Sequence, residues 1–134
     1  MRKNRKYWMT ALPTAVLCLA VTVIHIIDQG GLTALKDPAY IGYLYYALEI
    51  AGVLTALLLV TRRLLPIAWL IAIGVAVGPI FGYVTTRSVG LPNYTDDIGN
   101  WTEPLGLISL ATEGLLLIVI GAWFIKQRRR DDMR

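Results

Sequence analysis

Four long apolar segments constrain this chain more than any other feature of its sequence. They cover residues 8–28, 41–61, 64–86 and 104–125, and little of the chain lies outside them. About 20 apolar residues in an α-helix, at 1.5 Å of rise per residue, match a hydrocarbon core of about 30 Å. The 134 residues are 56% hydrophobic and 16% charged, which is too apolar for an ordinary soluble domain of this size. The sequence therefore predicts an all-α integral membrane protein whose single domain, 1–134, is an up-down-up-down four-helix bundle.

The basic residues predict the orientation of this bundle. Eleven of the thirteen fall on one side, before the first segment, between the second and third, and after the fourth. They are Arg2, Lys3, Arg5, Lys6, Arg62, Arg63, Lys126, Arg128, Arg129, Arg130 and Arg134. The positive-inside rule makes that side cytoplasmic. We therefore expect a multi-pass protein of a bacterial cytoplasmic membrane, with both ends inside. Its basic ends would lie against anionic lipid headgroups, with a partner-docking tail as the alternative and no nucleic-acid partner.

The first apolar segment also resembles a secretory signal, because basic residues precede it. Its apolar run is too long for one, and no small-residue cleavage site follows Asp28. We expect it to be a retained helix. Cys18 is the single cysteine, so an internal disulfide, a redox pair and a thiolate metal cluster are all excluded.

The connections between the segments differ in length. The turn at residues 61–63 is short, whereas the two outer loops, at about 29–40 and 87–103, hold most of the irregular residues. Thr102 or Glu103 can cap the fourth helix, with Pro104 in its first turn, where the missing N–H is not needed. We expect the specific surface of the protein to face outward.

Glycines recur at every fourth position of the third segment, at Gly74, Gly78 and Gly82. Such a ridge lets two helix backbones approach closely in lipid. It predicts close packing within the bundle, with a dimer seam as the alternative. Pro79 lies in the same segment and is expected to bend it.

Two carboxyl groups lie deepest in the apolar segments. Glu49 and Glu113 each fall roughly 12–14 Å below the outer ends of the second and fourth helices, which is near the middle of a bilayer. A charged side chain at that depth costs at least about 2.5–3.5 kcal/mol, so it turns inward, loses its charge or finds a partner. Because the second and fourth helices are diagonal in a simple bundle, both carboxyls can point into one central volume.

The other polar side chains of the outer half lie on helix faces that can meet the same volume. The sequence therefore predicts an outward-facing polar pocket with two glutamates as its floor and further polar groups around its rim. The predicted ligand-binding residues are Glu49, Glu113, His25, Arg87, Tyr45, Tyr46, Tyr83 and Asp28. Purely structural roles stay open: a neutral, hydrogen-bonded glutamate, a packing histidine, and an arginine at a helix end paired with Asp96 or Asp97.

Two elements of the chain resemble a widespread family of small four-helix bacterial membrane proteins. One is Thr86-Arg87-Ser88-Val89-Gly90-Leu91-Pro92, which is similar to the S/T-R-T/S-x-G-L-P element that follows helix three in that family. The other is Glu103-Pro104-Leu105-Gly106, which is similar to its E-P-x-G element at the start of helix four. Glu113 and the histidine in the outer half of helix one also match. The resemblance implies the architecture and the outer pocket, and it supplies no reaction.

Several classes of function follow from these observations. The preferred hypothesis is a binding protein whose outer pocket holds a small ligand, with a metal ion and a lipid-like molecule both open. The alternatives are a proton-coupled carrier of small solutes and an accessory subunit of a larger membrane complex, with a protein partner or a second copy of the chain. A single histidine cannot supply both axial ligands of a haem, and the sequence identifies no other cofactor. The absence of a nucleophile constellation argues against an enzyme.

Overall fold

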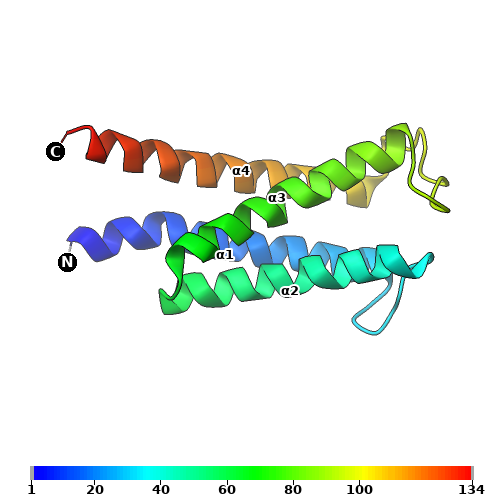
Figure 1. The fold of residues 1–134 in the computed structure, drawn as a ribbon, viewed down its shortest axis with the longest axis horizontal. Helices are drawn as coiled ribbons and strands as arrows, with labels where there is room; N and C mark the ends of the chain where they lie inside the picture. The colour runs from blue at the N-terminus through cyan, green and yellow to red at the C-terminus, as the bar shows by residue number, and fades with distance from the viewer. Residues whose placement is uncertain (1, 134) are drawn as a thin grey trace.

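The computed structural model describes residues 2–133, which form four α-helices (Figure 1). They are α1 (Arg2–Gln29), α2 (Ala39–Thr61), α3 (Leu65–Ser88) and α4 (Pro104–Asp131). Each is long and apolar enough to cross a membrane. The predicted all-α class is confirmed. Met1 and Arg134, the two ends of the predicted domain, lie outside the described residues.

The first and last helices are longer than the apolar segments that predicted them. α1 begins at Arg2, where the sequence predicted a start at residue 8, and α4 continues to Asp131, beyond the predicted end at residue 125. The predicted bounds followed hydropathy, whereas arginine, lysine and glutamine are good helix formers and continue a helix beyond its apolar part. The basic residues within 2–6 and 126–130 therefore lie on helices.

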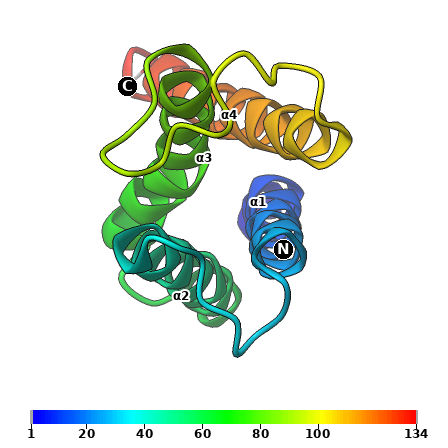
Figure 2. The same cartoon turned by 90° about the vertical axis from the view of Figure 1, so that its right-hand side faces the viewer.

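The bundle has two unlike ends. The two ends of the chain and the turn at residues 62–64 lie at one of them, here called the terminal end (Figure 1). The loops at residues 30–38 and 89–103 lie at the other, here called the loop end (Figure 2). α1 and α3 each pack against both α2 and α4 and also touch each other, while α2 and α4 make no contact among the described residues.

α3 changes its neighbourhood along its length. It starts beside α2 at the terminal end and moves away from α2 as it runs toward the loop end (Figures 1 and 2). The hydrophobic core occupies the middle and the terminal half of the bundle, where all four helices contribute buried residues. Trp69 of α3 and Trp123 of α4 extend this core with stacked indole rings, whose centroids are 4.3 Å apart.

α1 and α2 approach each other closely at Gly52. A Cβ atom at this position would overlap Thr22 Oγ1 and lie 2.9 Å from the carbonyl oxygen of Cys18. Thr22 uses the same hydroxyl to donate to the carbonyls of Cys18, at 3.1 Å, and Glu49, at 3.4 Å. The contact therefore depends on a glycine on α2 and on a hydroxyl that bridges the two helices.

The glycine ridge of α3 does not pack as the sequence predicted. A Cβ atom added at Gly74, Gly78 or Gly82 would meet no atom within 4 Å. The expectation of close intramolecular packing at this ridge is therefore wrong. The spacing of the glycines identifies a smooth helix face, but it does not identify what lies opposite that face. Gly78 and Gly82 face an open space at the loop end.

Candidate functional site

The loop end contains a cavity of about 450 Å³ between the outer parts of all four helices. This volume falls in the range of about 300–1,000 Å³ that is typical of small-molecule sites. The wall is mainly apolar and includes Leu44, Leu48, Gly78, Pro79 and Gly82. Its polar side chains are His25, Asp28, Tyr45, Tyr83, Thr85, Thr86, Arg87, Tyr94, Glu103 and Ser109.

Five of the eight predicted ligand-binding residues line this cavity. They are His25, Asp28, Tyr45, Tyr83 and Arg87. The other three, Glu49, Glu113 and Tyr46, do not. Most of the predicted rim residues therefore border this cavity, whereas the two glutamates predicted as its floor do not.

One side of the cavity is a chain of polar contacts between α1, α2 and the first loop. The Tyr45 hydroxyl donates to the Asp28 carboxylate, and Lys36 Nζ donates to the same oxygen at 2.8 Å. The Lys36 ammonium also lies 4.7 Å from the centre of the Tyr45 ring. The centres of the His25 and Tyr45 rings are 5.2 Å apart. These contacts hold the first loop onto the helices and fix the tyrosine ring in the cavity wall.

The hydrogen bonds of His25 determine what its ring offers to the cavity. Nδ1 lies 2.8 Å from the carbonyl oxygen of Val21, and a carbonyl can only accept, so Nδ1 carries the proton. In the neutral ring, Nε2 then has a free lone pair. Nε2 lies 4.0 Å from Glu113 Oε1, too far for a direct hydrogen bond. The ring can therefore accept a hydrogen bond from a molecule in the cavity.

Glu113 lies behind the cavity wall. Its side chain is buried, with 1% of its area exposed, and Ser109 donates a hydrogen bond of 2.5 Å to Oε1. Serine and glutamate are four residues apart, so they share one face of α4. Ser109 lines the cavity, which makes it the link between the buried carboxyl and that space.

Glu49 is tied to α1 rather than to Glu113. Its main-chain carbonyl accepts the hydrogen bond from Thr22, and its side-chain Oε1 is buried with no hydrogen-bond partner among the described residues. No hydrogen bond or ion pair within residues 2–133 joins the two glutamates. The helices that carry them do not touch, because α1 and α3 separate them. The structure therefore does not bring the two predicted floor residues together.

Arg87 is held by several groups at the end of α3. Its guanidinium lies 3.8 Å from an Asp97 oxygen and 3.6 Å from a Glu103 oxygen. It also stacks 4.1 Å from the centre of the Tyr83 ring and donates to the Thr86 hydroxyl. The sequence left two acidic partners open for this arginine, Asp96 and Asp97, and the structure places Asp97 beside it.

The start of α4 is built around the same arginine. Glu103, one of the two caps that the sequence left open, caps the helix, because its carboxylate accepts from the amides of Leu105 at 3.2 Å and Gly106 at 2.7 Å. A Cβ atom at Gly106 would lie 2.7 Å from the Tyr83 ring and 3.3 Å from the Arg87 guanidinium. The Tyr83 hydroxyl donates to the carbonyl of Trp101 at 2.6 Å. The two sequence elements of the family resemblance therefore meet in space and close this end of the bundle.

The loops cover the cavity from outside the helices. Tyr40 donates to the carbonyl of Pro92 at 2.6 Å, which ties the start of α2 to the second loop, and Tyr46 donates to the carbonyl of Ala34. Tyr94 reaches the cavity from the second loop, and burial together with the nearby Asp97 carboxylate raises the pKa of its phenol. This phenol therefore stays neutral over the physiological range.

Several polar residues of the site were not among the predicted ligand-binding residues, and Lys36 and Tyr94 are two of them. Lys36 is one of only two basic residues on its side of the segments, which was a usable signal. Tyr94 lies in a loop, where no periodicity indicates what a side chain faces.

Metal binding finds little support in the arrangement. Within residues 2–133, no group of three or more His, Cys, Asp or Glu side chains could hold a metal ion. No family model, curated protein or solved structure matches the chain. The geometry of the cavity is therefore the basis for any statement about function.

Proposed function

We propose that this protein spans the bacterial cytoplasmic membrane four times, with both ends in the cytoplasm, and binds a small lipid-like molecule in the loop-end cavity. The outer surfaces of the helices support the first part. Large apolar side chains on α1, such as Leu12, Val16 and Ile27, are each more than half exposed. Apolar surface of this extent is stable against lipid and unfavourable in water.

Two exposed positions test the orientation. Leu32 lies in the first loop and is 72% exposed, and Met133 lies at the terminal end and is 79% exposed. The native Cys18 is fully buried, so it gives a low labelling background. A membrane-impermeant maleimide should label Leu32→Cys in intact spheroplasts and should label Met133→Cys only after the membrane is opened. The reverse pattern would contradict the proposed orientation.

The composition of the cavity wall carries the proposal for the ligand. Apolar residues of α2 and α3 supply a surface for an apolar body, whereas His25 and Arg87 lie where a polar end would be. The free lone pair of His25 Nε2 suits a hydroxyl donor, and the Arg87 guanidinium suits an acidic or carbonyl oxygen. Leu44 and Phe81 line the cavity and are also largely exposed on the outside of the bundle. A lipid-like molecule can therefore enter sideways, between α2 and α3.

Glycines of α3 allow this proposal to be tested by filling the cavity. Gly78 and Gly82 line it, and an added Cβ at either would meet no atom within 4 Å. The double variant Gly78→Leu, Gly82→Leu should fold and lose most of the free space. Gly74→Leu with Gly121→Leu is the matched control, since both positions are equally open and lie outside the cavity wall.

The measurement is native mass spectrometry of protein extracted gently from membranes. We expect an additional small-molecule mass on the wild type and on the control variant, and its loss from the cavity-filled variant. Wild-type protein that carries no additional mass, or a cavity-filled variant that retains it, would refute the proposal.

The proton-coupled carrier is the second candidate, because the buried Glu113 carboxyl reaches the cavity through Ser109. It requires uptake into liposomes that depends on a pH gradient and is lost in Glu113→Gln. The binding proposal requires neither result.

A further inference from the structure

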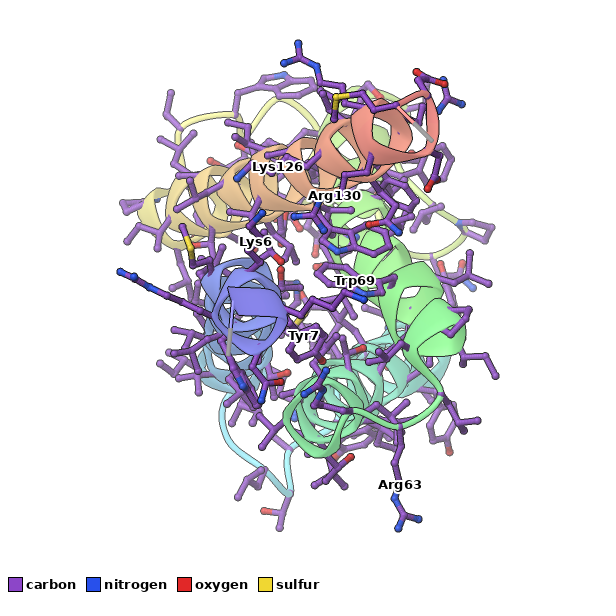
Figure 3. All side chains as sticks on the ribbon, turned by 90° about the vertical axis from the view of Figure 1, so that its left-hand side faces the viewer. Lys6, Tyr7, Arg63, Trp69, Lys126 and Arg130 are labelled. Carbon is purple, nitrogen blue, oxygen red and sulfur yellow. The ribbon has the colours of Figure 1, made fainter. Side chains whose placement is uncertain are left out.

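A second hollow lies at the terminal end of the bundle. It is a groove of about 1130 Å³ between α1, α3 and α4, to which α2 contributes no residue. Figure 3 looks onto this end of the bundle, where Lys6, Lys126 and Arg130 lie around the groove with Trp69 and Tyr7 beside them, while Arg63 points away. The groove shares no residue with the loop-end cavity.

The rim of the groove is strongly basic. It carries Lys3 and Lys6 from α1 and Lys126 and Arg130 from α4, and no acidic side chain lines it. The ion pairs found among residues 2–133 involve none of these four cations. Four positive charges without a carboxylate partner therefore surround one opening, and they complement a phosphate or another compact anion.

The floor of the groove is aromatic and apolar. Trp69 and Trp123 stack there, with an angle of 13° between their planes, and the Trp123 ring meets Phe124 edge to face at 4.7 Å. Leu70 and Met9 continue the floor to the outside of the bundle, where they are 67% and 62% exposed. An apolar chain can follow this path from the cations to the surface of the helices.

We infer that this groove binds an anionic phospholipid of the cytoplasmic leaflet, with the headgroup phosphate between the cations and an acyl chain along the apolar floor. The inference rests on the membrane insertion and orientation proposed above. A soluble anion would use the cations alone, whereas the floor gives the acyl chain a surface of its own. Basic pockets between transmembrane helices on the cytoplasmic side commonly hold such headgroups.

The experiment compares two variants of equal charge. Lys6→Gln, Lys126→Gln and Arg130→Gln together remove three cations from the groove. Arg63→Gln, Arg128→Gln and Arg129→Gln together remove three cations from the same end of the molecule, none of which lines the groove. All six side chains are exposed, so neither variant should unfold the bundle. Purified protein in detergent is titrated with phosphatidylglycerol or phosphatidylcholine, and bound lipid is counted by native mass spectrometry.

We expect the wild type to prefer phosphatidylglycerol. Each cation near a membrane surface contributes about fivefold to the binding of an anionic lipid, so the groove variant should lose about a hundredfold and the control much less. Equal losses in the two variants, or undiminished binding in the groove variant, would overturn the inference. Displacement of the lipid by an equal concentration of soluble glycerol phosphate would also overturn it, because the acyl chain would then contribute nothing.

Because the groove and the cavity lie at opposite ends, the two ligand tests fail separately. Loss of phosphatidylglycerol selectivity would not remove the loop-end ligand, and filling the cavity at Gly78 and Gly82 would not abolish the selectivity for phosphatidylglycerol.

Discussion

Substituting Gly52 by alanine tests the close contact between α1 and α2. The new methyl group would overlap Thr22 Oγ1 and lie 2.9 Å from the carbonyl oxygen of Cys18, whereas ordinary contacts are 3.4–4 Å. The threonine can rotate away, but the carbonyl belongs to the backbone of α1, so the two helices must separate by a few tenths of an ångström. Overpacking of this kind costs about 1–3 kcal/mol. Rotation of Thr22 also breaks its hydrogen bonds to the two helices, at about 0.5–1.5 kcal/mol.

Gly74→Ala is the matched control for this prediction, because a Cβ at Gly74 meets nothing within 4 Å. Both substitutions raise helix propensity by up to about 1 kcal/mol, and this gain cancels in the comparison. We expect Gly52→Ala to be less stable than Gly74→Ala by about 1.5–4.5 kcal/mol. For a chain of this length, that corresponds to roughly 5–20 °C in the midpoint of thermal unfolding.

The assay is thermal unfolding of both variants in the same mild detergent, followed by circular dichroism. Adding Thr22→Ala to Gly52→Ala should restore part of the loss, because it removes the side-chain overlap and leaves the carbonyl contact. If the midpoints of Gly52→Ala and Gly74→Ala agree to within about 2 °C, then α1 and α2 do not approach each other as described.

Three other predictions follow from the buried groups and the loop end. Ser109→Ala should cost about 1–3 kcal/mol of stability in the same assay, because the carboxyl of Glu113 loses its hydrogen bond while it stays buried; an unchanged midpoint would contradict that contact. Arg87→Met should speed proteolysis within residues 89–103 several-fold, because the second loop loses its ion pair to Asp97, and cleavage at the wild-type rate would show that this pair does not hold the loop. Cys18 should react with a maleimide only after unfolding, since its side chain is fully buried, and labelling of the folded protein would contradict the core.

The sequence was sufficient for the elements that depend on local physics. Hydropathy located the four helices, and the residue types at 102–104 predicted a cap of α4 at Thr102 or Glu103, of which Glu103 provides it. The polar faces of α1, α2 and α3 pointed to His25, Asp28, Tyr45, Tyr83 and Arg87, and these five residues line the cavity. Each of these predictions needs only helical periodicity or the chemistry of one turn.

Features that depend on how the helices are tilted could not be predicted. The spacing of Gly74, Gly78 and Gly82 indicates a smooth face, but only the course of α3 away from α2 leaves that face open. The depth of Glu49 and Glu113 in their segments was similar, but a common depth does not fix what each residue contacts: Glu49 bonds to α1 through its main-chain carbonyl, and Glu113 bonds to Ser109 of its own helix. The stack of Trp69 on Trp123 likewise depends on the relative rotation of α3 and α4.

The oblique course of α3 gives it the geometry of a lever. Its middle packs into the core, its loop-end half borders the cavity together with α2, and its terminal half borders the groove on the side away from α2. If α3 swung as a rigid rod about that middle, its loop end would approach α2 while its opposite end moved into the groove. The loop-end cavity and the groove would then narrow together or widen together. A molecule bound in either hollow would then keep the other open, so the two ligands should strengthen each other's binding from opposite ends of the bundle.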